Sequence, residues 1–73
     1  MYTKAMQEAW KKIKKPFAFK VAIVEYPNAL FVRVWEHQIM EFNEGQRVQI
    51  MAYLETVRST LASFGVQCHI EGI

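Results

Sequence analysis

The stretch NEGQRVQIMAYLETVRSTLASFGV, residues 43–66, decides the fold because it predicts one long helix with a marked beginning and end. Asn43 is a favourable N-cap residue, and Gln46 three positions later completes a capping-box pattern. Gly65 is predicted to adopt the left-handed conformation that ends many helices. Val66 would then pack back on the last turn, as in a Schellman ending.

The predicted helix, about residues 44–64, carries a continuous apolar face. Its large apolar side chains recur at spacings of four, three, four and three residues, which places them on one side of the helix. These side chains are Ile50, Leu54, Val57, Leu61 and Phe64. We expect this side of the helix to face the core.

Two runs of alternating residues before the helix predict a β-hairpin. Residues 17–26 carry apolar side chains on both faces, which is typical of a central strand. Residues 30–36 carry aliphatic side chains on one face and two aromatic residues around an arginine on the other. Pro27-Asn28 between the runs is a turn sequence, because proline fixes φ and asparagine tolerates the left-handed region.

Shorter elements flank the hairpin and the long helix. Residues 3–14 predict a helix with Thr3 as N-cap, and Pro16 should end it because proline disfavours helical geometry at the preceding residue. The apolar stripe of this helix consists of Met6, Trp10 and Ile13. Residues 66–70 predict a short strand. Residues 37–42 either extend the second strand or form a loop that tucks two apolar side chains inward.

The resulting order, α-β-β-α-β, predicts a single small α+β domain over residues 1–73. If the long helix makes a right-handed crossover that skips one strand, residues 17–26 lie between residues 30–36 and 66–70. The expected fold is a three-stranded antiparallel sheet of order 3-1-2, a split βαβ arrangement, packed against the long helix and the N-terminal helix. If both helices share one sheet face, the other face stays partly bare.

The composition predicts a binding partner. The chain has 73 residues, of which 52% are hydrophobic and 14% aromatic, whereas a domain of this size hides only about 60–65% of the surface that its unfolded chain exposes. Exposed apolar patches usually mark interaction surfaces. We therefore expect a homodimer or a complex with a larger protein. The alternative is a generously packed monomer.

Positive charge is concentrated in the N-terminal part of the chain. Residues 1–20 hold six lysines and one glutamate, a net charge of +5, whereas residues 21–73 carry a net charge of −3. Four lysines fall within five positions: Lys11, Lys12, Lys14 and Lys15. They are candidate contacts for nucleic-acid phosphates, with Trp10 as a stacking platform, or for an acidic protein. The alternative is a solvated helix end, with Trp10 facing the core.

Phe31, Arg33 and Trp35 are a second candidate partner-binding site. They alternate on one face of the predicted strand 30–36, and aromatic residues and arginine are enriched at the energetic centres of protein interfaces. As a predicted edge strand, this segment would be able to pair across a two-fold axis or to accept a strand from a partner. The alternative is that this face packs beneath the first helix.

No catalytic or metal-binding pattern stands out in the sequence. Cys68, His69 and His37 supply three metal ligands at most, whereas a structural zinc site needs four. Cys68 and His69 also point to opposite faces of a strand. The glutamates are scattered, the chain has no aspartate, and its three glycines form no phosphate-binding loop. We therefore expect no cofactor, no metal and no enzymatic activity.

The expected location is the cytoplasm. Cys68 is the only cysteine, which excludes a disulfide within the chain and favours a reducing compartment over secretion. The N-terminus shows no charged segment followed by a long apolar run, as a secretory signal would. No run approaches the roughly 18 consecutive apolar residues of a membrane helix, so no membrane partner is expected.

Together these observations predict a small non-enzymatic protein-interaction module that binds a larger macromolecular partner. In size and layout the chain resembles the small accessory and host-inhibiting proteins of bacterial viruses and mobile elements, anti-CRISPR proteins included. That resemblance implies an accessory or inhibitory role and no particular site residues. The alternatives are a small nucleic-acid-binding protein that uses the lysines and a structural subunit of a larger assembly.

Overall fold

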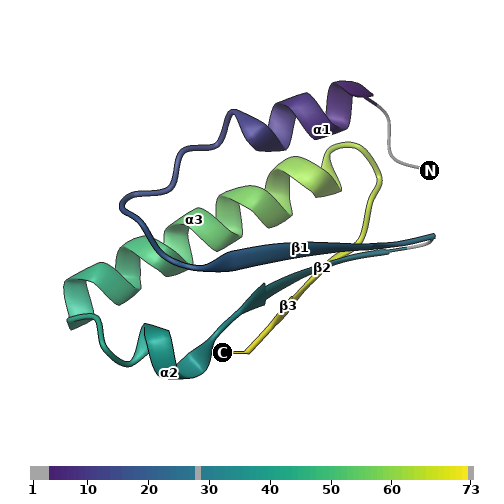
Figure 1. Cartoon of the computed structure of the whole chain (residues 1–73). Coiled ribbons are helices and arrows are strands. Elements are labelled where there is room, and N and C mark those ends of the chain that lie inside the picture. The colour runs from purple at the N-terminus through teal and green to yellow at the C-terminus, as the bar shows by residue number, and fades with distance from the viewer. Residues whose placement is uncertain (1–3, 28, 73) are drawn as a thin grey trace.

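The computed structural model describes residues 4–27 and 29–72, in which three helices accompany a three-stranded sheet (Figure 1). The helices are α1 (Lys4–Lys11), α2 (Glu36–Ile39) and α3 (Glu44–Ala62), and the strands are β1 (Val21–Tyr26), β2 (Ala29–Val34) and β3 (Cys68–Glu71). The α+β class and the order of the main elements are confirmed, with α2 as an addition. Thr3 and Asn28, the predicted N-cap and turn residues, lie outside the described residues.

Helix α3 begins where its local sequence predicts. The side chain of Asn43 accepts a hydrogen bond from the backbone N–H of Gln46 at 2.8 Å, and the side chain of Gln46 accepts one from the backbone N–H of Asn43 at 3.1 Å. The capping box is therefore complete. Four of the predicted core-facing residues are fully buried: Ile50, Leu54, Val57 and Leu61.

The end of α3 is the predicted Schellman motif. The N–H of Gly65 donates to the carbonyl of Ala62 at 2.9 Å, and the N–H of Val66 donates to the carbonyl of Leu61 at 3.1 Å. Gly65 has a φ of 77°, the left-handed conformation that this motif requires. Phe64 lies beyond the last helical residue and is 44% exposed, so its assignment to the core face was wrong.

Helix α1 is shorter than predicted, because it ends at Lys11 and the chain turns immediately afterwards. The N–H of Ile13 donates to the carbonyl of Trp10 at 3.1 Å, which closes that turn. Met6 is buried, and Trp10 and Ile13 are partly buried against the core. The predicted apolar stripe is therefore confirmed, although the helix that carries its first part ends three residues earlier than predicted.

The segment after β2, predicted as strand or loop, is the short helix α2. The N–H groups of Gln38 and Ile39 both donate to the carbonyl of Trp35 at 3.0 Å, which starts the helical turn. Ile39 is buried and Phe42 packs against the core. These two apolar side chains thus point inward, as the loop alternative expected of them.

The order of the strands differs from the prediction. Strand β1 pairs with β2 antiparallel, with Val21 opposite Val34, and β2 pairs with β3 in parallel, with Leu30 opposite Cys68. The sheet is therefore mixed and has the order β1-β2-β3. The predicted 3-1-2 order is wrong because α3 returns the chain to the side of β2, the strand that it has just left, and skips no strand.

Strand β2, predicted to lie at an edge, is the middle strand. Its aliphatic residues Leu30, Val32 and Val34 are at most 2% exposed, since strands lie on both sides and α3 lies above them. Strand β1, predicted to lie in the middle, is an edge strand. Its Val21 and Ile23 pack against the core, whereas its other apolar residues, Ala22 and Val24, lie on the opposite face of the sheet.

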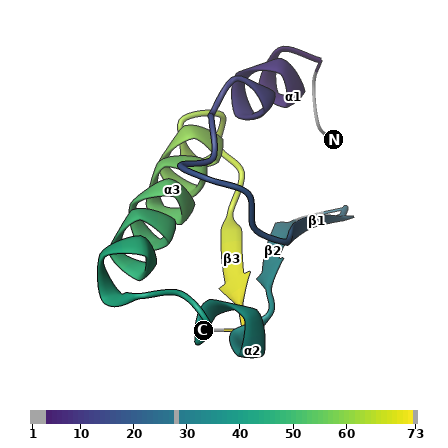
Figure 2. The same ribbon diagram turned by 60° about the vertical axis from the view of Figure 1, so that its left-hand side comes forward.

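Helices α1 and α3 lie on the same side of the sheet. Figures 1 and 2 show α1 and α3 stacked above one sheet face, and neither lies over the other face. The core fills the space between this helical layer and the sheet. The question that the sequence left open is thus resolved in favour of a sheet with one uncovered face.

Candidate functional site

The uncovered side of the sheet is the candidate site, and we call it the open face. Alternate residues of a strand point to opposite sides, so the residues between the core-facing ones lie here. The open face consists of Ala22, Val24, Tyr26, Phe31, Arg33, His69 and Glu71, extended at one end by Lys20 and Trp35. None of these side chains belongs to the core cluster.

Aromatic rings form a row across the three strands of the open face. The Tyr26 and Phe31 rings meet edge to face, with centroids 5.1 Å apart and planes at 80°. The Phe31 ring stacks on His69 of β3 at 5.0 Å and 24°. Tyr26 is 51% exposed. The row combines flat apolar area with hydrogen-bonding groups at both ends, a combination common in protein interfaces.

A charged pair lies beside this aromatic row. Arg33 of β2 stands opposite Glu71 of β3, and both the Nε and a terminal nitrogen of Arg33 donate to one carboxylate oxygen, at 3.3 and 3.1 Å. The side chains are 54% and 39% exposed. An exposed pair of this kind adds little to stability, so the arginine is available to a binding partner at small cost.

At one end of the open face, Lys20 and Trp35 face each other across the β1–β2 pairing. They follow directly on the pair Val21 and Val34, and the Lys20 ammonium lies over the Trp35 ring, 4.2 Å from its centroid. This is a cation–π contact. It places the cation and the indole ring together at this end of the open face.

The predicted site of Phe31, Arg33 and Trp35 therefore lies on one face, and that face does not pack beneath α1. The predicted edge position of this strand is wrong, because β2 is central. Sequence analysis missed the neighbours of these residues: Lys20, Tyr26, His69 and Glu71. Their alternation within each strand was visible, but only the strand order shows that they meet.

The four candidate lysines do not form one helical face. Lys11 ends α1, whereas Lys12, Lys14 and Lys15 lie in the connection to β1, and all four are exposed. Lys15 donates to the carbonyl of Phe19 at 3.0 Å and lies over the Phe19 ring, 5.4 Å from its centroid. The ring that was a candidate stacking platform, Trp10, packs against the core instead.

Cys68 and His69 point to opposite sides of β3, as predicted. Cys68 packs against the core, where burial raises the pKa of its thiol and nearby Arg58 opposes that shift weakly. His69 stacks on Phe31 on the open face. Among residues 4–27 and 29–72, no three histidine, cysteine or acidic side chains lie close enough to hold a metal ion.

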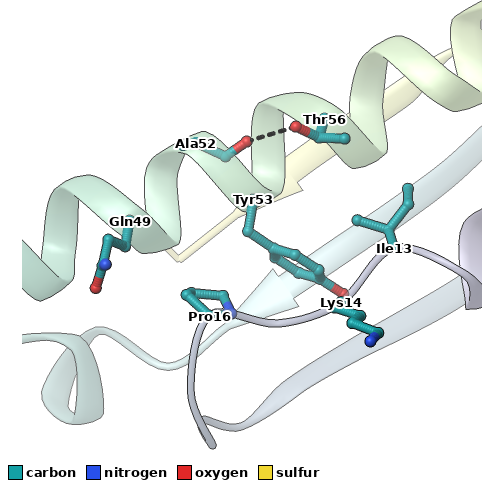
Figure 3. Close-up of a pocket in the computed structure, with 7 residues that line it drawn as sticks. All are labelled: Ile13, Lys14, Pro16, Gln49, Ala52, Tyr53 and Thr56. Atoms are coloured by element: carbon teal, nitrogen blue, oxygen red, sulfur yellow. Dashed lines mark hydrogen bonds between the residues drawn. The ribbon is translucent and has the colours of Figure 1, made fainter.

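A second surface feature is a shallow groove of about 350 Å³ between α3 and the segment that joins α1 to β1 (Figure 3). It is lined by Ile13, Lys14, Pro16, Gln49, Ala52, Tyr53 and Thr56. The Thr56 hydroxyl donates to the carbonyl of Ala52 in its own helix at 2.9 Å. Burial raises the pKa of Tyr53. The lining offers no pair of groups placed for acid–base chemistry.

Comparisons with protein-family models, with curated proteins and with solved structures found no match for the chain. In the described part of the chain, no helix is long and apolar enough to cross a membrane.

Proposed function

We propose that this protein is a non-enzymatic protein-interaction module that binds a larger macromolecular partner through the open face. One observation carries the proposal: both long helices cover the same side of the sheet, and the other side presents aromatic rings around an exposed arginine. Tyrosine, tryptophan and arginine are the residue types that dominate binding energy at protein interfaces. Its effect would be to occupy a surface on that partner, as an accessory or inhibitory protein does.

Two further features belong to this proposal. Large hydrophobic side chains remain exposed outside the small core, and exposed apolar surface usually marks an interaction site. This supports a homodimer as the binding unit. Cys68 forms no disulfide, which supports action in a reducing compartment such as the cytoplasm.

The test compares two arginines with matched surroundings. Arg33 on the open face and Arg58 on α3 are each about half exposed, at 54% and 46%, and each pairs with a glutamate, Glu71 and Glu55. The variants Arg33→Glu and Arg58→Glu therefore make the same change of charge on different surfaces. The tagged wild-type protein and both variants are used to capture proteins from a cell lysate, followed by mass spectrometry.

The expected result is a protein that the wild type and Arg58→Glu capture alike, and that Arg33→Glu captures roughly tenfold less or not at all. Circular dichroism of all three proteins establishes that they are folded. If every captured protein binds Arg33→Glu as well as the wild type, the open face is not the binding surface and the proposal is wrong.

A further inference from the structure

We infer that two copies of this chain join along the outer edges of their β1 strands, so that their sheets become one six-stranded sheet with a doubled open face. Strand β1 pairs with β2 on one side, and no strand of the described residues pairs with its other side. Such an edge presents backbone N–H and C=O groups to solvent and is a template for another strand. The inference rests on the proposed function, because this edge borders the open face.

The sequence of β1 favours a second copy, antiparallel, as the occupant. Lys20 precedes the strand and Tyr26 ends it, and both lie on the open face. Antiparallel pairing of two identical strands places the lysine of each copy near the Tyr26 ring of the other, where a cation–π contact is favourable. Parallel pairing in register would place the two Lys20 side chains opposite each other, which is unfavourable across neighbouring strands. The edge is thus complementary to itself in the antiparallel orientation.

The register follows from the faces and from Pro27. In a continuous sheet, residues that lie opposite each other must point to the same side. In an antiparallel pair of identical strands this holds only if one residue lies opposite its own copy, with the two-fold axis between them. Proline has no N–H, so the new ladder should end before Pro27. An axis at Ile23 pairs the whole strand: Lys20 lies opposite Tyr26 of the second copy, and Ala22 lies opposite its Val24.

The side chains on the open face fit this register. The Lys20 ammonium already lies over the Trp35 ring of its own chain, 4.2 Å from the centroid. In the proposed dimer it also lies beside the Tyr26 ring of the second copy, so that each lysine is placed between two aromatic rings. The aromatic row of one copy then continues through this lysine to the Trp35 ring of the other.

The contact should be reversible and dependent on concentration. Pairing two six-residue edges buries less surface than the roughly 800 Å² per partner of a standard stable interface. We therefore expect a monomer at low concentration and a dimer of twice 8.6 kDa as the concentration rises, measured by sedimentation velocity. Lys20→Glu should shift this equilibrium toward monomer, whereas Lys20→Arg, which keeps the cation, should leave it in place.

Cysteine cross-linking tests the register directly. Two proteins are made in a Cys68→Ala background, one with Ala22→Cys and one with Val24→Cys, both substitutions lying on the open face and outside the core. Opposite residues in an antiparallel pair have Cβ atoms close enough for a disulfide. Under mild oxidation, the mixture of the two proteins should form roughly tenfold more covalent dimer than either protein alone.

Three results would overturn the inference. They are equal cross-linking in the mixture and in the single proteins, efficient cross-linking of Ala22→Cys alone, and a wild type that stays monomeric at millimolar concentration. The proposed function is tested separately. If cross-linking fails while Arg33→Glu still loses its captured partner, the dimer is wrong and the function stands. If the mixture cross-links while Arg33→Glu loses nothing, the function is wrong and the dimer stands.

Discussion

The ammonium group of Lys20 lies 4.2 Å from the centroid of the Trp35 ring. These two residues lie directly outside β1 and β2, next to the pair Val21 and Val34. Trp35 is also the residue that precedes α2, and its carbonyl accepts the first hydrogen bonds of that helix. The side chain of Trp35 thus belongs to the open face while its backbone helps to build the fold.

Trp35→Ala should therefore weaken binding while the protein stays folded. The backbone carbonyl that starts α2 remains, and the side chain contributes no part of the core cluster. We expect a loss of about 1 kcal/mol in the free energy of unfolding and a loss of roughly tenfold or more in partner binding or self-association. Thermal denaturation followed by circular dichroism measures the first effect. If the variant is unfolded, Trp35 is a core residue and not part of an interaction surface.

Leu30 and Phe31 are neighbours in sequence that should respond very differently to truncation. Leu30 is 0% exposed, so Leu30→Ala should lower the free energy of unfolding by about 2–5 kcal/mol. Phe31 makes ring contacts on the open face only, so Phe31→Ala should cost about 0.5–1.5 kcal/mol. Urea denaturation of both variants gives the comparison. Equal losses would mean that the open face is buried in the folded protein.

Gly65 and Gly45 provide a matched pair for the end and the start of α3. Gly65 has a φ of 77°, which any other L-residue adopts with strain, so Gly65→Ala should destabilise the protein by about 1 kcal/mol. At Gly45, an added Cβ would lie 3.4 Å from the side-chain oxygen of Asn43, an ordinary contact. Gly45→Ala should change stability by less than about 0.5 kcal/mol. Chemical denaturation of the two variants checks the difference, and a stable Gly65→Ala would argue against the Schellman ending.

The stability of the protein should fall at alkaline pH. Burial raises the pKa of Cys68 from its ordinary value of 9.0 and that of Tyr53 from 10.0. In the unfolded chain these groups lose their protons at lower pH than in the folded protein. Rising pH therefore favours the unfolded state and lowers the free energy of unfolding. Their contribution is fully present below about pH 9 and is lost as pH rises through the folded-state values. Urea midpoints measured from pH 7 to pH 11 test this, and Cys68→Ala should reduce the slope. A slope unchanged in Cys68→Ala would contradict the role of the thiol.

The four lysines should not make the protein a nucleic-acid-binding protein. Trp10, the candidate stacking ring, packs against the core, and Lys15 is engaged with Phe19. We therefore expect no gel shift with random single- or double-stranded oligonucleotides at low salt, where phosphate contacts are strongest. A shift that disappears in a variant with Lys11 and Lys12 replaced by glutamine would contradict this expectation.

Local features of this fold were predictable from the sequence, whereas the non-local arrangement of the strands was not. The capping box of Asn43 and Gln46 and the helix ending at Gly65 were predicted residue by residue, because each depends on side chains within four positions. The strand order was wrong because it depends on where α3 returns the chain, which no short segment encodes. The apolar pattern of β1 is typical of a central strand, whereas half of its apolar residues belong to the open face.

In the candidate site, too, the local features were predicted and the non-local contacts were not. Phe31, Arg33 and Trp35 were predicted to share a face because alternation within one strand is a local property. Their partners His69 and Glu71 lie on a strand 38 positions further along the chain. Only the parallel register of β2 and β3 brings them together, so the aromatic row and the Arg33–Glu71 pair were not predicted.

The parallel pairing of β2 and β3 has a consequence for the order of folding. The hairpin of β1 and β2 and the helix α3 are each local, but β3 reaches β2 only after the long loop containing α3 has closed. Docking of β3 against β2 is therefore expected to be a late step in folding, after the hairpin and α3 have formed. His69 and Glu71 reach Phe31 and Arg33 only in that step, so the open face is expected to become complete later than the hairpin that carries most of it.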